Sequence, residues 1–137
     1  MPYRFEIERK SKLLAVRFDG DITVDELRRF YFFEVPKLLV RSDLRGSIVD
    51  FSNATMSGVS PQDIRELAAQ PPADPDAKRL RVIVATTPHV FGLSRMFELH
   101  GEETRPHLHV VSSLSQAYAL LGVTDPKFEP VEKNPAT

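Results

Sequence analysis

The chain has 137 residues, a formal net charge of -1 at neutral pH and no cysteine, and 42% of its residues are hydrophobic. This length suits one domain with a substantial core, and the lack of thiols excludes disulfide scaffolds, thiol catalysis and thiolate zinc sites. The nearly neutral charge gives no field that attracts nucleic acid, and the tight basic group of Lys78, Arg79 and Arg81 is interpreted as a solvated entrance to a strand.

The first residues predict a β-hairpin. Apolar and charged side chains alternate over residues 3–8 and again over residues 14–18, and the polar residues 9–12 form the turn between them. Since no apolar secretion signal precedes this alternation, we expect the protein to be cytoplasmic. We expect no membrane insertion either, because no stretch approaches the roughly 20 apolar residues of a membrane span.

The first helix follows a break in the chain at residues 19–21. Thr23 and Glu26 form a capping box that predicts its start. Pro36 complicates its end, because proline lacks the N–H group that would bond to the carbonyl of Phe32. We therefore expect the helix either to kink there or to stop just before the proline and restart.

Strands and helices alternate along the rest of the chain. Each of the three remaining helices is expected to open on a serine or threonine N-cap. The expected strands are residues 47–51, 80–85 and 108–111, and the expected helices begin after Ser60, Thr87 and Ser113.

The resulting order, β-β-α-β-α-β-α-β-α, predicts an α/β domain with about four helices and a mixed, mostly parallel β-sheet. The strand at residues 47–51 is almost continuously apolar, which places it at the centre of the sheet. We expect residues 1–124 to form the domain. Residues 125–137 contain three prolines and few apolar residues, so we expect a flexible C-terminal tail.

The order and spacing of several segments match a known family. These segments are the hairpin ending in FDG at residues 18–20, the strand IVDFS at 48–52, the helix after Ser60, the strand at 82–85 and GLSRM at 92–96. With them the chain resembles, from residue 3 to about 122, the SpoIIAA-like branch of the STAS superfamily, small cytoplasmic α/β proteins related to anti-sigma factor antagonists. The lipid-transfer CRAL-TRIO domains share a comparable topology, which adds apolar ligands by analogy.

The resemblance implies a modified serine. STAS antagonists carry an Asp-Ser-Ser-Gly loop after the third strand, whose serine a partner kinase phosphorylates, and this chain reads MSGVSP at residues 56–61. By position Ser60 comes closest to that serine, and Ser57 is the second candidate. A phosphate on Ser60 would meet the positive end of the following helix. The residue chemistry favours the alternative that Ser60 is simply an N-cap.

Hydroxyl and amide side chains follow the predicted parallel strands. Because the carboxyl ends of such strands meet at one edge of the sheet, beside helix N-termini, these side chains are candidates for holding a small anion. The same residue types are the ones that helix caps require, which is the simpler interpretation. The candidates are Ser52, Asn53, Thr86, Thr87, Ser112 and Ser113.

The third helix is apolar over about half of its circumference, which is more than covering a sheet requires. We interpret this surplus as a surface for self-association or as the wall of a ligand pocket, with a deeply buried helix as the alternative. The residues that define the surface are Phe91, Leu93, Met96 and Phe97.

The sequence predicts no catalytic centre. No nucleophile stands with a base, and no pair of carboxylates is suggested, so we expect no enzymatic activity and no cofactor. Asp50, within an apolar strand, is expected to have a structural, hydrogen-bonded role. The four histidines lack a carboxylate at ligand-like spacing, so no metal site is expected.

We therefore expect a non-enzymatic, STAS-like module that acts by binding a protein partner or a second copy of itself, with regulation like that of anti-sigma antagonists. The alternative is a carrier that holds a small apolar or anionic ligand between the third helix and the edge of the sheet.

Overall fold

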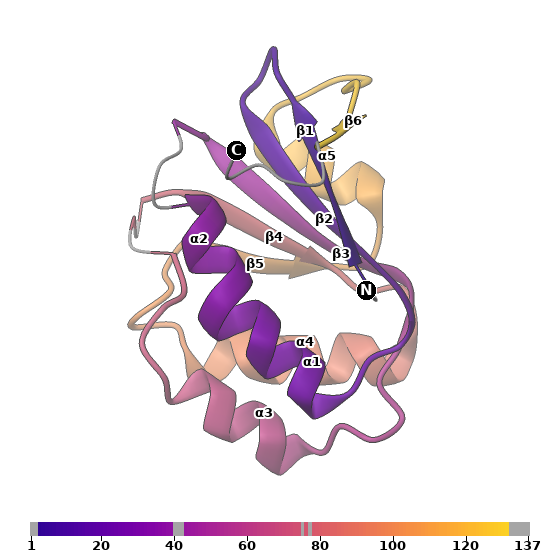
Figure 1. The fold of residues 1–137 in the computed structure, drawn as a ribbon, viewed down its shortest axis with the longest axis vertical. Helices are drawn as coiled ribbons and strands as arrows, with labels where there is room; N and C mark the ends of the chain where they lie inside the picture. Colours follow the sequence, from indigo (N-terminus) through magenta and orange to yellow (C-terminus); the bar gives the residue numbers. More distant parts are fainter. Residues whose placement is uncertain (1–2, 40–42, 75, 77, 132–137) are drawn as a thin grey trace.

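A computed structural model describes residues 3–39, 43–74, 76 and 78–131, which form one mixed sheet with helices on both faces (Figure 1). The elements in chain order are β1 (Tyr3–Glu8), β2 (Leu13–Asp21), α1 (Val24–Arg29), the π-helix η1 (Phe30–Glu34), α2 (Val35–Leu39), β3 (Gly46–Thr55), α3 (Pro61–Ala68), β4 (Leu80–Val84), α4 (Pro88–His100), β5 (Leu108–Val111), α5 (Leu114–Leu121) and β6 (Glu129–Pro130).

The sheet has the strand order β5-β4-β3-β2-β1-β6. Strands β2 to β5 run parallel to one another, whereas β1 pairs antiparallel with both β2 and β6. The expectation of an α/β domain with a mixed, mostly parallel sheet and a central third strand is confirmed. The edge strand β6 was not expected, and it extends the predicted order by one element.

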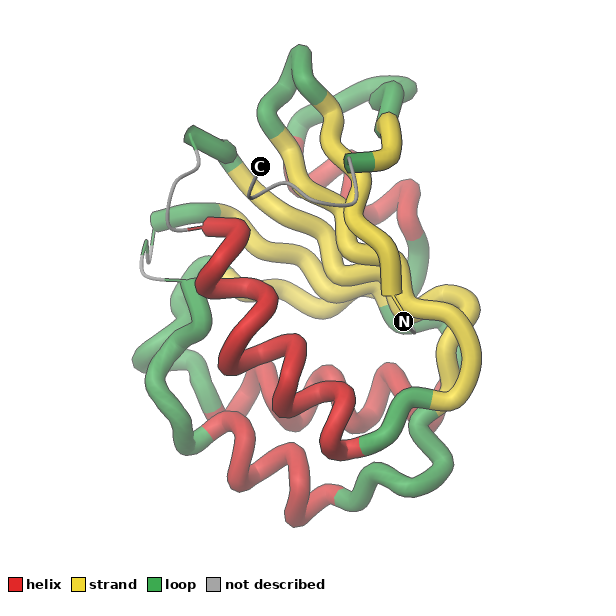
Figure 2. Tube along the Cα trace, viewed as in Figure 1, coloured by secondary structure: helices red, strands yellow, loops and turns green. Residues whose placement is uncertain are grey.

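The period of two along each strand divides the apolar side chains between two cores. In β2, Leu14, Val16 and Phe18 face the core beneath α1, η1, α3 and α4, and Leu13 and Ala15 face the smaller core beneath α5. Figure 2 shows the sheet between these helices and α5, which lies on its other face. Both faces of the central strands are therefore buried, as parallel strands require.

The first helix continues through Pro36 instead of stopping. Segments α1, η1 and α2 form one continuous helix, and in η1 the N–H of Val35 bonds to the carbonyl of Phe30, one residue farther back than in an α-helix. Because proline has no N–H and its ring would crowd the carbonyl four residues before it, a wider turn ahead of Pro36 relieves both problems. The expected stop before Pro36 is therefore wrong, and the helix accommodates the proline with a π-turn, which the sequence did not predict.

The segment that was expected to be a flexible tail lies partly against the sheet. The two residues of β6 pair with Glu6 and Ile7 of β1, and the ring of Phe128 stacks on Tyr118 with 6.4 Å between the ring centroids. The edge of β1 and the surface of α5 supply this contact, which composition alone could not reveal. Residues 132–137 lie outside the described part of the chain.

Candidate functional site

A cavity of about 130 Å³ lies between the sheet and the helices of the larger core. Its walls are almost wholly apolar, since strand residues of one parity meet the inward faces of the helices. The apolar side chains that line it include Leu14, Val16, Leu27, Phe30, Val35, Val49, Phe51, Met56, Ile64, Ile83, Leu93, Phe97 and Leu108.

The distorted turn of the first helix forms part of the wall. Phe30 and Tyr31 of η1 and Val35 directly after it line the cavity. Single π-turns occur frequently at functional sites, because the extra residue redirects the side chains around it. Here Pro36 requires the distortion, and the distortion lies at the cavity.

Among the residues that the structure describes, the charged side chains that line the cavity are Asp74, Arg81 and Arg105. In the sheet register Arg81 lies between Ser47 of β3 and Leu108 of β5. This row is at the amino ends of the parallel strands, whereas the sequence directed attention to their carboxyl ends. Arg81 is therefore at the opposite end of the sheet from the serine loop.

Arg81 is the least satisfied of these groups. Its Nε and Nη2 atoms are buried, and neither has a hydrogen-bond partner within the described residues. Burial lowers the pKa of Arg81, and the charge of Arg105 adds to this effect, while the carboxylate of Asp74 opposes it. A buried donor left without a partner costs about 1–3 kcal/mol, and more when it is charged. Arg81 is therefore short of hydrogen-bond partners, and a molecule that reached its guanidinium would supply them.

Asp74 is only 2% exposed. Its Oδ1 atom lies 3.5 Å from Nη1 of Arg79 and accepts a hydrogen bond from the N–H of Asp76 at 2.9 Å. Its Oδ2 atom is buried and has no hydrogen-bond partner among the residues that the structure describes. Asp74 is thus held in place by one oxygen while the other is unused.

Arg105 has a different role, because its guanidinium is largely satisfied. It donates to the carbonyls of Ala68 at 3.1 Å and Gln70 at 2.8 Å and to the hydroxyl of Tyr31. Its Cζ atom lies 4.6 Å from the centroid of the Phe97 ring, a distance typical of a cation–π contact. Arg105 therefore ties the wall of the cavity together.

The sequence pattern missed these residues. We expect the basic group of Lys78, Arg79 and Arg81 to be solvated, and Lys78 is exposed, but Arg79 is buried and Arg81 is half-buried, so the prediction is wrong for both arginines. One signal was present: Arg81 and Ile83 have the same parity in β4 and therefore share a face of the sheet. An arginine at a core-facing strand position indicates a buried cation, whereas nothing local identified Asp74 or Arg105.

Both candidate serines for phosphorylation lie exposed in the loop between β3 and α3. The Ser60 hydroxyl accepts from the N–H of Asp63, and the Asp63 carboxylate accepts from the N–H of Ser60 at 2.8 Å, which completes a capping box. The Ser60 hydroxyl also donates to the Asp63 carboxylate at 2.9 Å. The Ser57 hydroxyl donates to the carboxylate of Asp21 at 2.8 Å. The backbone N–H of Ser57 and that of Ser60 donate to these same carboxylates and are the largest cause of the lowered pKa of Asp21 and Asp63, and the serine hydroxyls add to the effect. Each serine is therefore accessible, but a phosphate on either would face a carboxylate.

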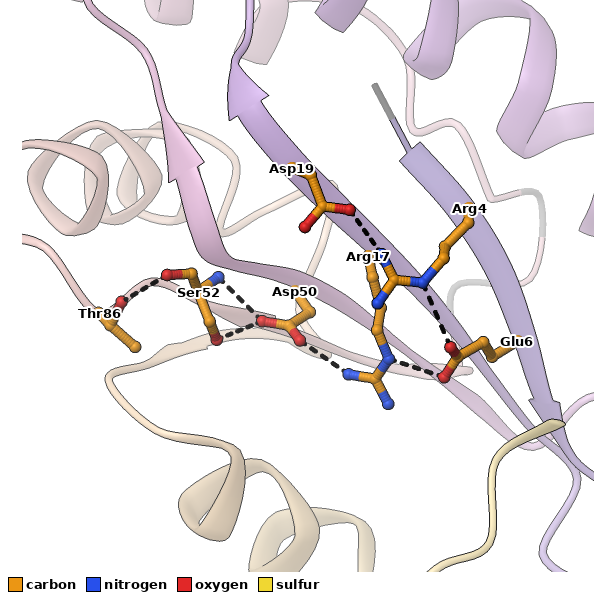
Figure 3. A network of polar contacts seen from close by, with 7 residues as sticks. All are labelled: Arg4, Glu6, Arg17, Asp19, Asp50, Ser52 and Thr86. Atoms are coloured by element: carbon orange, nitrogen blue, oxygen red, sulfur yellow. Dashed lines mark hydrogen bonds and ion pairs between the residues drawn. The ribbon is translucent and has the colours of Figure 1, made fainter. Parts of the chain in front are cut away.

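The candidate anion site at the carboxyl ends of the strands is only partly assembled. The Thr86 hydroxyl donates to the carbonyl of Ser52 at 3.3 Å, and the Ser52 hydroxyl donates to Asp50 (Figure 3). Asn53 and Thr87 are exposed, and Thr87 is an N-cap without a side-chain hydrogen bond. The hydroxyl of Ser52 is thus used within the sheet, next to a carboxylate.

Asp50 belongs to a network of ion pairs on the α5 side of the sheet. Figure 3 shows Arg17 between two carboxylates, with Nε 2.7 Å from Glu6 and Nη1 2.7 Å from Asp50. The hydrogen bonds of Asp50 with Arg17 and Ser52 agree with the structural role expected for it. This network joins β1, β2 and β3.

The third helix, α4, turns most of its apolar surface inward. Leu93 is buried and Phe97 is half-buried, and both line the cavity, while Phe91 and Met96 are half-buried against the larger core. The expected surplus of apolar surface is therefore largely used for the core and for the cavity wall. Leu99 is the large apolar residue of α4 that remains exposed.

Comparison with known proteins gives no identification: models of protein families do not match the chain, and a search of curated proteins finds no similar sequence. The described residues contain no helix long and apolar enough to cross a membrane. Within the same residues, no group of three or more histidine or acidic side chains gathers in a way that could hold a metal ion.

Proposed function

We propose that the protein binds a small apolar molecule in the cavity between the sheet and the helices of the larger core, α4 among them. This is the second of the two functions expected from the sequence. The cavity carries the proposal, because close-packed protein interiors leave few voids much larger than a water molecule. Here a space of about 130 Å³ with an almost wholly apolar wall, partly open to solvent, is left unfilled by the side chains around it.

The volume sets the size of the molecule. An apolar cavity of about 150 Å³ in another protein stays dry and binds benzene. The cavity has a volume of about 130 Å³ and therefore suits a molecule of similar size, such as one with a single six-membered ring. Burial of apolar surface supplies about 25 cal/mol for each Å² removed from water, so the binding of such a body is favourable.

Toluene is a suitable probe for this proposal. We expect it to shift the methyl resonances of Val16, Val49 and Leu93, which line the cavity, in the NMR spectrum of the labelled chain. At ten times its dissociation constant it would stabilise the fold by about 1.4 kcal/mol. For a domain of this size, that raises the melting temperature by roughly 4–7 °C.

A variant that fills the cavity provides the matched test. Ser94 is buried on α4 and lines the cavity, so Ser94→Leu places an apolar side chain in the space. We expect Ser94→Leu to fold and to lose the response to toluene, and Ala119→Leu on the exposed face of α5 to retain it. If toluene shifts neither the cavity methyl groups nor the melting temperature of the unsubstituted chain, the proposal fails.

Binding of a protein partner or a second copy stays a prediction, and so does membership in the STAS superfamily. The exposed rings of Phe32 and Phe33 on η1 are apolar surface that favours such an interaction. The geometry of Ser57 and Ser60 does not add to it, because both hydroxyls already donate to carboxylates.

A further inference from the structure

We propose, on the basis of the cavity binding above, that the ligand is a monocarboxylate with a benzene-sized apolar body, and that Arg81 binds its carboxylate. The proposal rests on three observations: which atoms of Arg81 lack partners, the charge of the cavity lining and the shape of the remaining space.

The atoms of Arg81 that have no hydrogen-bond partner among the described residues are Nε and Nη2. These nitrogens form one edge of the planar guanidinium, and their N–H bonds point in nearly the same direction. A carboxylate accepts both through its two oxygens, in the bidentate geometry for which arginine is suited. A neutral hydroxyl or carbonyl group offers one oxygen and satisfies this edge less well.

The charge of the lining favours a single negative charge. Arg81 and Arg105 contribute two positive charges and Asp74 one negative charge, so the cavity lining has a formal net charge of +1. A monocarboxylate neutralises this charge. A dicarboxylate or a phosphate dianion would leave an excess negative charge close to the unpartnered Oδ2 atom of Asp74. Arg79, the other cation close to Asp74, already forms ion pairs with Asp74 and Asp76.

The rest of the cavity suits a ring. Phe30, Tyr31, Phe51 and Phe97 all line it, and aromatic side chains pack favourably against the edges and faces of other rings. A long alkyl chain does not fit a volume of about 130 Å³. Benzoate is therefore the appropriate probe, and benzamide is its neutral counterpart of nearly the same shape.

Calorimetric titration at pH 7 tests the role of Arg81. We expect benzoate to bind at least tenfold more tightly than benzamide. In Arg81→Met the affinity for benzoate should fall at least tenfold while that for toluene stays within twofold. Arg81→Lys keeps the positive charge but loses the pair of parallel N–H donors. Its affinity for benzoate should therefore lie between that of the unsubstituted chain and that of Arg81→Met. Arg65→Met, at an exposed arginine of α3, is the control and should bind as the unsubstituted chain does.

The outcomes separate this inference from the proposed function. The inference is overturned if toluene binds but benzoate binds no more tightly than benzamide. It is overturned as well if Arg81→Met retains the affinity for benzoate. In both cases water, not a carboxylate, solvates Arg81, and the proposed binding of an apolar molecule in the cavity stands. If none of the three probes binds to the unsubstituted chain, both proposals fail. If Arg81→Met does not fold, the loss of benzoate affinity in Arg81→Lys decides the question.

Discussion

The guanidinium of Arg105 donates a hydrogen bond to the hydroxyl of Tyr31, which joins the segment before β5 to the π-turn of the first helix. The Tyr31 hydroxyl in turn donates to the carbonyl of Pro71 at 2.6 Å, and Arg105 also donates to the carbonyls of Ala68 and Gln70. One buried cation therefore holds together three segments that surround the cavity.

The coupling between Arg105 and Tyr31 can be measured with a double-mutant cycle. Tyr31→Phe removes two hydrogen bonds and should lower the free energy of unfolding by about 1–2 kcal/mol. Arg105→Met should cost more, about 3 kcal/mol, because it leaves buried carbonyls without their charged donor. We expect a coupling energy of about 0.5–3 kcal/mol from urea unfolding of the single and double variants.

Tyr118→Phe is the control for this cycle, because no hydrogen bond of its hydroxyl is described and its ring would still stack on Phe128. It should change stability by no more than about 0.5 kcal/mol. Strictly additive effects of Tyr31→Phe and Arg105→Met would show that the two residues act independently.

A second prediction concerns the N-cap of α3. Ser60→Ala removes the hydroxyl that accepts from the N–H of Asp63 and should lower stability by about 1 kcal/mol, whereas Ser60→Asn should cost less because asparagine also caps helices and brings no charge next to Asp63. Thermal unfolding of both variants measures the difference.

A phosphate on Ser60 would lie next to the carboxylate of Asp63, so we expect the phosphorylated chain to melt at a lower temperature than the unmodified one. A higher melting temperature would contradict this and would favour a phosphorylation switch.

Most of the fold was predictable because its signals are local. Alternation in β1 and β2, the proline that follows Ser60 and the capping residues of the helices all act within a few positions of the chain. The first helix shows the limit of prediction from such local signals. The sequence identified Pro36 as a difficulty, but whether a helix stops or widens depends on the packing of Phe30 and Tyr31 against the rest of the protein.

The candidate site was less predictable, because its charged residues come from separate parts of the chain. Asp74 lies in a loop, Arg81 in β4 and Arg105 before β5, and only the register of the sheet and the Arg105 hydrogen bonds bring them to one cavity. Short polar residues after strands, such as Ser52 and Thr86, were conspicuous in the sequence. They satisfy backbone groups and neighbouring carboxylates, which is the commoner use of such residues.

A third prediction concerns the ion pairs of Arg17. Burial lowers the pKa of this guanidinium, but its hydrogen bonds with Glu6 and Asp50 outweigh that effect and raise it overall. Removing one partner of a fully buried pair costs about 3–5 kcal/mol, and since Arg17 is 16% exposed we expect Arg17→Met to cost about 2–3 kcal/mol. Urea unfolding measures this cost.

The double variant Arg17→Met, Asp50→Asn shows where that cost comes from. If it arises from an unpaired carboxylate at Asp50, the double variant should be more stable than Arg17→Met alone. A double variant that is less stable by the sum of the two single effects would refute this explanation. Arg9→Met, at an exposed ion pair with Glu129, should change stability by less than about 1 kcal/mol.

The last prediction concerns Glu8, whose carboxylate links the β1–β2 turn to the C-terminal segment. It accepts hydrogen bonds from the N–H groups of Lys127, Lys10 and Ser11. The bond from Lys127 is the largest cause of a lowered pKa, and burial opposes it only in part. A carboxylate whose pKa is lower in the folded chain than in the unfolded chain stabilises the fold when the pH is above its pKa in the unfolded chain, which is near 4.5. This contribution is lost as the pH falls through the pKa of the folded chain.

Glu8→Gln should therefore be less stable than the unsubstituted chain at pH 7, and the difference should shrink below about pH 4.5 as Glu8 takes up a proton. Urea unfolding at a series of pH values from 7 to about 3 measures both effects. Glu102→Gln, at an exposed position after α4, controls for the general effect of removing a negative charge. A stability difference for Glu8→Gln that stayed constant with pH would mean that the charge of Glu8 does not hold the C-terminal segment. Loss of the β1–β6 amide protection in hydrogen exchange of Glu8→Gln at pH 7 would locate the effect at Lys127 and β6.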